Sequence, residues 1–217
     1  MNVLDIHTHR RLPSTPGTAI INYTDAGFFM DVSSFRKGEF YSVGLHPWDL
    51  TKKDIADQFI WLNHWLESDQ VVALGEAGLD KFASASMNLQ MTVFEKEIEL
   101  SEQRQLPLII HCVRAVDELL FLKKKYNPVQ PWIWHGFRGK IELMNQLLRH
   151  GFYFSFGEFY HEEAMAAVPG ERLFLETDEG EKTMEELLVR AADIRSVTTQ
   201  QLQRTIQENI QNVFFTK

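Results

Sequence analysis

The sequence predicts a compact (β/α)8 barrel, an α/β fold in which eight parallel strands alternate with helices, as one domain over residues 1–217. Two observations lead to this prediction. Eight short apolar runs recur along the chain, and most are followed by a segment with helical periodicity. The length of 217 residues also lies close to the lower limit of about 200 residues for such a barrel.

The predicted strands share a short apolar run that ends in a polar or glycine-containing turn. They cover residues 3–6, 19–23, 41–45, 71–74, 108–110, 132–134, 153–156 and 173–175. Because these runs alternate with helical patterns, the sheet is expected to be parallel.

Predicted helices fill most of the gaps between the strands. They cover residues 55–65, 89–100, 116–126, 141–148, 184–189 and 199–215. Within the second of them, Val93, Phe94 and Ile98 form one apolar stripe. Residues 10–17 leave no room for a full helix and residues 24–39 look short, so we expect the first two crossovers to be abbreviated.

The composition limits the class of protein and its location. The net charge is −8, with 30 acidic and 22 basic residues, which argues against a protein that coats nucleic acid by general electrostatics. This net charge is still compatible with a nuclease whose bound cations supply positive charge locally. Cys112 is the only cysteine, which excludes an intrachain disulfide and favours a reducing compartment. With no leader pattern and no long apolar run, we expect a cytoplasmic protein that does not enter a membrane.

The first predicted strand leads into Asp5, His7 and His9. Side chains alternate along a strand, so these three are expected to point to the same face. Titratable groups on one face of a buried strand are costly unless something satisfies them, and a divalent metal ion does so. The alternative is a chance His-x-His on an exposed strand end.

Further histidines and carboxylates follow other predicted strands: His46, Glu76, His111, His135 and Asp178. In a (β/α)8 barrel the carboxyl ends of the strands meet at one face, where active sites lie. One histidine at a strand end is usually a hydrogen-bonded core residue. The coincidence across six strands instead favours a pair of divalent ions about 3.5–4 Å apart.

Six sequence motifs occur in a fixed order along the chain. They are Val-Leu-Asp-Ile-His-Thr-His, Ser-Val-Gly-Leu-His-Pro, Ala-Leu-Gly-Glu-Ala-Gly-Leu-Asp, Pro-Leu-Ile-Ile-His, His-Gly-Phe-Arg-Gly and Leu-Glu-Thr-Asp. Together they resemble the TatD family of metal-dependent deoxyribonucleases over essentially the whole chain.

The resemblance implies two divalent ions, Zn²⁺, Mg²⁺ or Mn²⁺, and a set of residues that hold them. The implied ligands are His7, His9 and Asp178 for the first ion, His111 and His135 for the second, and Glu76 as a bridge between them. His46 matches a catalytic-site histidine beside the metals, and Asp178 matches the residue that accepts a proton from the attacking water. Asp5 is expected to support the ligands.

The chain departs from the family pattern around the substrate. Glu179 and Gly180 replace the usual Ser-Pro after Asp178, and Arg114 is displaced by one position after His111. Lys81, Arg114 and Arg138 are the candidate cations for a substrate phosphate, or else solvated loop charges. Trp48 and Phe137 are expected either to stack on a base or to pack at the rim.

The leading hypothesis from these residues is hydrolysis of a phosphodiester in nucleic acid, DNA above all, or of a small phosphoester. No obligate protein partner is evident. An alternative is hydrolysis of an amide or lactone, or a deamination, on the same barrel. A third is a non-catalytic metal-binding barrel, which the open six-ligand set makes less attractive because structural sites are usually closed.

Overall fold

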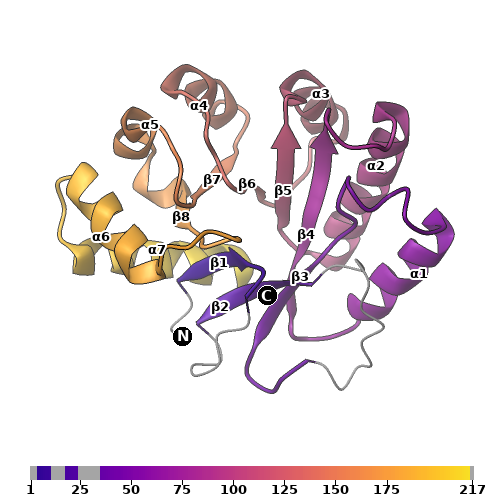
Figure 1. Cartoon of the computed structure of the whole chain (residues 1–217), viewed down its shortest axis with the longest axis horizontal. Helices are drawn as coiled ribbons and strands as arrows, with labels where there is room; N and C mark the ends of the chain where they lie inside the picture. The colour runs from indigo at the N-terminus through magenta and orange to yellow at the C-terminus, as the bar shows by residue number, and fades with distance from the viewer. Residues whose placement is uncertain (1–3, 11–17, 24–34, 216–217) are drawn as a thin grey trace. The chain divides into compact units, whose positions relative to one another are not determined.

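A computed structural model describes residues 4–10, 18–23 and 35–215, and its strands follow the order of a closed barrel (Figure 1). The strands of these residues are β1 (Asp5–Thr8), β2 (Ala19–Tyr23), β3 (Phe40–Val43), β4 (Val71–Asp80), β5 (Leu108–Val113), β6 (Trp132–Trp134), β7 (Tyr153–Phe156) and β8 (Leu173–Leu175). The predicted (β/α)8 class is confirmed. The abbreviated crossovers fall largely within residues 11–17 and 24–34, which lie outside the described residues.

The contacts divide the chain into two compact units, which we describe one at a time. The terminal unit comprises Met1–Ile21 and Ile133–Lys217, and the central unit comprises Asn22–Trp132. The expectation of one domain over residues 1–217 stays a prediction.

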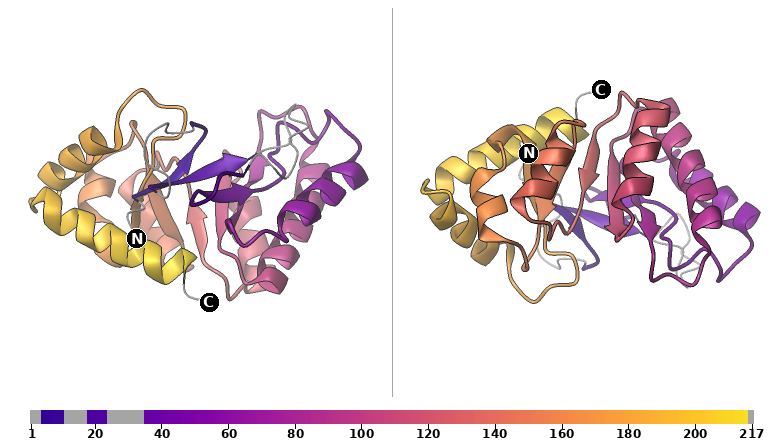
Figure 2. Two further views of the ribbon diagram at one scale, coloured as in Figure 1. Left: turned by 90° about the horizontal axis from the view of Figure 1, so that it is seen from below. Right: turned by 90° about the horizontal axis from the view of Figure 1, so that it is seen from above.

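The terminal unit combines parallel strand pairs with four helices. β1 pairs with β2 and β8, and β7 pairs with β6 and β8. The helices are α4 (Ile141–Leu148), α5 (Glu162–Ala167), α6 (Met184–Ile194) and α7 (Thr199–Phe214). α6 and α7 lie side by side (Figure 2), and each begins at a threonine capping box, Thr183 and Thr198 respectively. These caps satisfy backbone N–H groups that would otherwise lack partners, and so fix where both helices begin.

Aromatic side chains fill the core of the terminal unit. Phe137, Phe154 and Phe156 are all fully buried. The Phe137 ring meets the other two edge to face, with centroid distances of 4.8 and 5.8 Å. Such contacts stabilise a core beyond the area that they bury. Of the two roles expected for Phe137, packing is therefore the one that the structure supports.

Among its described residues, the central unit combines three helices with three paired strands. β4 pairs with β3 and with β5, and the helices are α1 (Ile55–Trp65), α2 (Met87–Arg104) and α3 (Val116–Tyr126). α2 packs on β4 and buries Val93, Phe94 and Ile98, each at most 1 % exposed. The apolar stripe predicted for this helix is confirmed.

β4 runs past its predicted end at residue 74 as far as Asp80, and two glycines explain the difference. A Cβ atom on Gly75 would lie 2.3 Å from the carbonyl oxygen of Ile109, and one on Gly78 would lie 2.1 Å from that of His111. Only residues without side chains let β4 approach β5 this closely. The glycines therefore continue the strand instead of ending it, and they place Glu76 within it.

The helices differ from prediction mainly at their ends. α2 extends beyond its predicted bounds at both ends, and α6 continues past its predicted end at residue 189 as far as Ile194. α5 was not predicted, because it is short and begins after His161 without a side-chain cap. Among the helices of the described residues, none combines the length and apolar character needed to cross a bilayer.

A buried carboxyl group links α2 to the loop after β3. Glu97 is fully buried, and its Oε1 accepts a hydrogen bond of 2.7 Å from the backbone N–H of Leu45. Its Oε2 has no hydrogen-bond partner among the described residues. Burial raises the pKa of Glu97 well above its ordinary value, and the bond from Leu45 opposes this only in part. The folded protein thus keeps a proton that the unfolded chain releases above about pH 4.5.

Replacing Glu97 with glutamine is expected to flatten the pH dependence of stability. In the native sequence the free energy of unfolding falls by up to about 1.4 kcal/mol per pH unit from about pH 4.5 up to the raised pKa. Glutamine keeps the acceptor for Leu45 but cannot ionise. The stability of Glu97→Gln relative to wild type should therefore increase with pH, as measured by urea unfolding at several pH values with chelator present.

The matched control for this substitution is Glu99→Gln, two positions along the same helix, where the side chain is exposed. It should leave the pH profile unchanged. Equal profiles for the two variants would contradict a raised pKa at Glu97.

Candidate metal centre

The carboxyl ends of β1 and β8 bring two histidines and an aspartate together in the terminal unit. His7 belongs to β1 and His9 follows it, while Asp178 follows β8 and forms a parallel bridge with Thr8. Asp178 Oδ1 lies 3.7 Å from His7 Nε2 and 3.5 Å from His9 Nε2. The three ligands that the resemblance implies for the first ion thus lie together in one unit.

These separations suit two ligands of one ion better than a hydrogen bond. Both distances exceed the range of about 2.7–3.2 Å for an N–H···O bond. Ligand atoms that lie about 2.1 Å from a tetrahedral ion are about 3.4 Å apart. Imidazole nitrogen and carboxylate oxygen are also the ligand types that Zn²⁺ and Mn²⁺ accept. Each of the two histidine–aspartate pairs therefore has the separation of two ligands of one divalent ion.

Asp5 holds the segments that carry this cluster. It is buried, and its Oδ1 accepts hydrogen bonds from the backbone N–H groups of His7, at 3.2 Å, and Thr177, at 3.1 Å. Its Oδ2 accepts a bond of 2.6 Å from the Thr177 hydroxyl. Burial raises the pKa of Asp5 to about 7, although these hydrogen bonds oppose the shift. The supporting role expected for Asp5 agrees with its contacts to the segments that carry His7 and Asp178.

His135 lies in the same unit, between His7 and a carboxylate to which the sequence alone assigns no role. Its ring centroid is 4.4 Å from that of His7, and its Nδ1 is 3.3 Å from Glu176 Oε1. Glu176 is fully buried and also accepts a 2.6 Å bond from the backbone N–H of Gly136. Burial alone would raise the pKa of Glu176. The charge and the hydrogen bond of His135 lower this pKa by more than burial raises it, so the net shift is downward. Ligand atoms of His135, Glu176 and Asp178 lie within 4.8 Å of one another.

Arg10 ties the loop after Asp178 to the end of β1. Its guanidinium group donates a 2.8 Å hydrogen bond to the carbonyl oxygen of Glu179 and a second bond to that of Gly180. Arg10 is not among the residues that the sequence predicts for the site. Its position directly after His9 is the sequence signal that could have identified it. The loop that it contacts is also one of the places where the chain departs from the family pattern.

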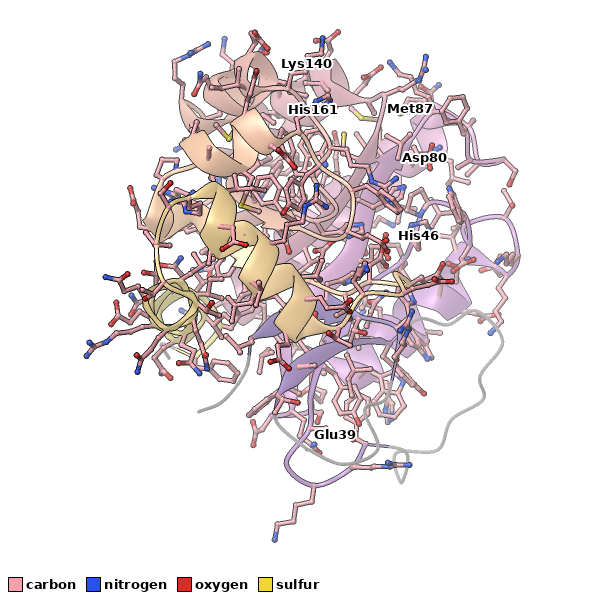
Figure 3. The ribbon with its side chains drawn as sticks, turned by 60° about the vertical axis from the view of Figure 1, so that its left-hand side comes forward. Glu39, His46, Asp80, Met87, Lys140 and His161 are labelled. Carbon is pink, nitrogen blue, oxygen red and sulfur yellow. The ribbon has the colours of Figure 1, made fainter. Side chains whose placement is uncertain are left out.

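The central unit holds a second cluster at the ends of β3, β4 and β5. His46 follows β3, Glu76 lies in β4 and His111 lies in β5, and Figure 3 labels His46 and Asp80 in this region. Glu76 Oε1 is 3.1 Å from His46 Nε2 and 2.8 Å from His111 Nδ1. The group offers one ligand atom from each residue within 4.8 Å. It therefore has the donor set of a divalent metal site, while the two distances to Glu76 Oε1 lie within the range of hydrogen bonds.

Two polar residues orient this second cluster. Asn22 donates to Glu76 Oε2 at 3.3 Å and accepts from the Glu76 backbone N–H at 3.0 Å. Asp80 Oδ2 lies 3.0 Å from His111 Nε2. Burial raises the pKa of Asp80, but its hydrogen bonds, that of His111 first, lower it more, and the net shift is downward. A carboxylate of this kind fixes the orientation of a ligating imidazole.

The candidate cations for a substrate phosphate already have other neighbours. Lys81 Nζ lies 2.7 Å from Glu118 Oε1, so its charge is paired. The Arg114 guanidinium lies over the ring of Phe82, and that of Arg138 lies over the ring of Phe159, each 5.3 Å from the ring centroid. The two arginines keep their charge available to an anion, whereas Lys81 would first have to leave Glu118.

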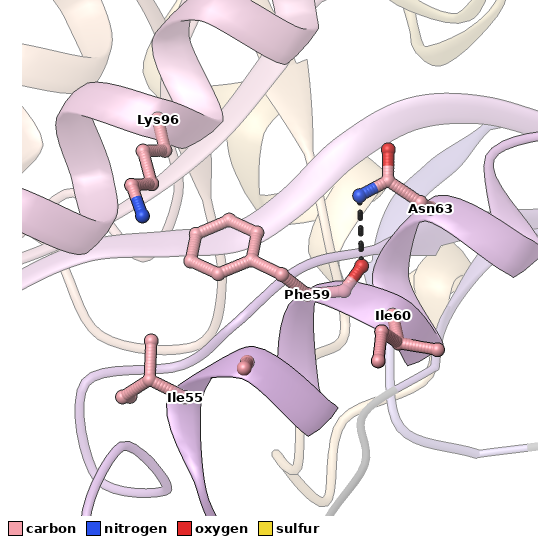
Figure 4. Close-up of a pocket in the computed structure, with 6 residues that line it drawn as sticks. Ile55, Phe59, Ile60, Asn63 and Lys96 are labelled. Atoms are coloured by element: carbon pink, nitrogen blue, oxygen red, sulfur yellow. Dashed lines mark hydrogen bonds between the residues drawn. The ribbon is translucent and has the colours of Figure 1, made fainter.

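The central unit also has a hollow, and its lining residues are not the candidate ligands or cations described above. Ile55, Phe59 and Ile60 of α1 line it together with Lys96 of α2, whose Nζ lies 5.0 Å from the Phe59 ring centroid (Figure 4). None of the candidate ligands lines it. Its apolar walls hold no carboxylate or imidazole, so it offers no metal chemistry.

Each unit thus carries part of the ligand set that the sequence predicts. His7, His9, His135 and Asp178 belong to the terminal unit, and His46, Glu76 and His111 belong to the central unit. A shared second ion between His111 and His135 stays a prediction, because the two residues belong to different units.

Comparison with known proteins identifies the family. The family model for TatD related DNase matches residues 31–215. The chain is 32 % identical over 149 residues to the uncharacterized metal-dependent hydrolase YabD of Bacillus subtilis, covering 63 % of this chain and 57 % of that protein. It is 33 % identical over 120 residues to the deoxyribonuclease Tat-D of Schizosaccharomyces pombe, covering 51 % of this chain and 38 % of that protein. The chain therefore spans little more than half of the first relative's length and less of the second's.

A solved structure shares the fold over the whole chain. The crystal structure of YjjV, a TatD homolog from Escherichia coli K12, superposes with a TM-score of 0.84 at 20 % identity, covering 100 % of this chain and 99 % of that one. At this identity the likeness establishes the fold. Because the family model covers most of the sequence, this chain belongs to the TatD-related DNase family.

Proposed function

We propose that this protein is a metal-dependent phosphodiesterase that hydrolyses nucleic acid, with DNA as the foremost substrate. The observation that carries the proposal is the separation of Asp178 Oδ1 from His7 and His9, which is too long for hydrogen bonds and right for a shared ion. The similarity to the deoxyribonuclease Tat-D of Schizosaccharomyces pombe supports the choice of substrate. A cytoplasmic location, expected from the single cysteine, is part of the proposal.

We infer that two divalent ions, Zn²⁺, Mg²⁺ or Mn²⁺, serve the reaction. His7, His9 and Asp178 would hold one of them, and His111 and His135 the other, with Glu76 as a ligand common to both. Support comes from the two clusters, each taken by itself, and from the general rule that active sites of these barrels use residues at the carboxyl ends of several strands.

The remaining roles in the proposed reaction are assigned to side chains of this protein. A bound divalent ion lowers the pKa of a coordinated water from 15.7 toward about 7. Asp178, with 31 % of its side chain exposed, is the residue that we assign to accept the proton that this water loses. His46 is the histidine that we assign to contact with the substrate, and Arg114 and Arg138 are the cations that would face the phosphate oxygens.

The test is metal-dependent cleavage of a labelled single-stranded oligodeoxynucleotide by the full chain. Protein stripped with chelator is expected to be inactive, and Mg²⁺, Mn²⁺ or Zn²⁺ should restore cleavage. The restoring ion should also raise the melting temperature, because an ion that binds only the folded state stabilises it.

The same experiment separates the rival functions. Metal-loaded protein that leaves oligonucleotides and p-nitrophenyl phosphoesters intact but hydrolyses lactones or amides would overturn the nuclease proposal in favour of the alternative hydrolase. A rise in melting temperature without hydrolysis of any substrate in this panel would overturn it in favour of a non-catalytic metal barrel.

A further inference from the structure

Trp48 is an exposed aromatic side chain that is nevertheless fixed in position. Its side chain belongs to the loop after β3, and the residue is 56 % exposed. The indole Nε1–H donates a 2.7 Å hydrogen bond to Asp80 Oδ2, and the backbone N–H donates to His46 Nδ1 at 3.2 Å. The hydrogen bond to Asp80 therefore fixes the orientation of the indole while more than half of the residue stays accessible.

The Trp48 ring lies directly beside the ligand cluster of the central unit. Its centroid is 5.1 Å from that of His46 and 5.9 Å from that of His111. Asp80 is the common anchor, because the same Oδ2 atom that accepts from Trp48 lies 3.0 Å from His111 Nε2. A group that rests on the indole would therefore be next to a phosphate held at this cluster.

A second exposed aromatic shares the same anchor. Phe82 is 71 % exposed, and its backbone N–H donates a 2.7 Å bond to Asp80 Oδ1. The Arg114 guanidinium lies over its ring. One buried carboxylate thus anchors the Trp48 ring and the Phe82 backbone at the end of β4. Aromatic rings and arginine are the residues on which single-stranded nucleic acids stack.

The charge of the chain makes stacking more important than phosphate attraction. The net charge is −8, and the Lys81 ammonium is paired with Glu118. Proteins that bind nucleic acid through many phosphate contacts carry a basic surface and lose affinity steeply with salt. Base contacts would therefore add to the affinity that the bound ions, Arg114 and Arg138 supply.

We propose that Trp48 stacks on a base of the substrate next to the scissile phosphodiester and is a residue through which this chain recognises a base. This inference rests on the proposed function and adds a base contact to the phosphate contacts of the site.

The test compares two ligands that differ only in their bases. A phosphorothioate oligothymidylate and an abasic phosphorothioate strand of the same length present the same charge, and neither should be cleaved rapidly. Metal-loaded wild-type protein should bind the thymidylate about tenfold or more tightly than the abasic strand. Trp48→Leu should reduce this ratio to near one, whereas Trp48→Phe, which keeps a ring but loses the bond to Asp80, should retain most of it.

Phe121→Leu is the matched control, because Phe121 is a similarly exposed aromatic (58 %) on α3 of the same unit. It should leave the ratio unchanged. An unchanged ratio in Trp48→Leu would overturn the stacking role, as would an equal loss in Trp48→Leu and Trp48→Phe, which would assign the effect to the Asp80 bond.

Failure of the proposed function would give a different experimental result. The wild-type protein would then cleave no unmodified oligonucleotide with any metal, and the stacking inference would be overturned together with the proposed function. If wild-type protein cleaves the oligonucleotide and Trp48→Leu does so with the same KM, only the stacking inference fails.

Discussion

Asparagine in place of Asp178 is expected to lower kcat by about 10²- to 10⁴-fold at saturating metal, the usual contribution of a general base. Asparagine keeps the size of the side chain but cannot accept the proton of the attacking water. The backbone should not change. Asp178 has a φ of 49°, which asparagine also tolerates, and its main-chain bonds with His7 and His9 do not involve the side chain.

Steady-state cleavage of the oligonucleotide, with the metal content of each preparation measured, checks this expectation. Asp193→Asn is the control, because Asp193 is exposed on α6 of the same unit. A kcat within threefold of wild type in fully metallated Asp178→Asn would remove the proton-accepting role. Full activity regained only at high metal concentration would show that Asp178 acts as a ligand alone.

Most of the fold could be predicted because hydrophobic runs with polar boundaries mark the elements clearly. β6, β7 and β8 have the predicted bounds, since each is a short apolar run between polar or turn residues. β4 was predicted too short, because a glycine within a run usually signals its end. Gly75 and Gly78 instead allow a close approach to β5. That role depends on a partner strand some 30 positions away, which local sequence cannot show.

The candidate ligands could be predicted for a related reason. His7, His111 and Asp178 lie at or just after the ends of strands, and topology alone assigns such positions to one end of a barrel. Glu176 and Arg10 were missed because long-range contacts define what they do. Glu176 acts through His135 and Gly136, some 40 positions away, and Arg10 acts through carbonyl groups 169 and 170 positions away.

Alanine in place of Gly78 is expected to lower the free energy of unfolding by more than about 4 kcal/mol, an effect large enough to leave the central unit unfolded. Gly78 has a φ of +144°, which L residues rarely adopt, and the new Cβ would lie 2.1 Å from the carbonyl oxygen of His111. That oxygen belongs to a paired strand and cannot turn aside. β4 would have to separate from β5, and the contact between Glu76 and His111 would be lost with it.

Gly151→Ala separates the two causes of this cost. Gly151 also has a positive φ, +76°, but no atom lies within 4 Å of the place that an alanine methyl group would occupy, so alanine there should cost only about 1–2 kcal/mol. Urea unfolding of both variants, with metal affinity as a second readout, makes the comparison. Similar losses of stability would mean that backbone conformation alone explains the glycine at position 78. A much larger loss in Gly78→Ala, together with weaker metal binding, would mean that the close approach of β4 to β5 is what holds the ligands of the central unit together.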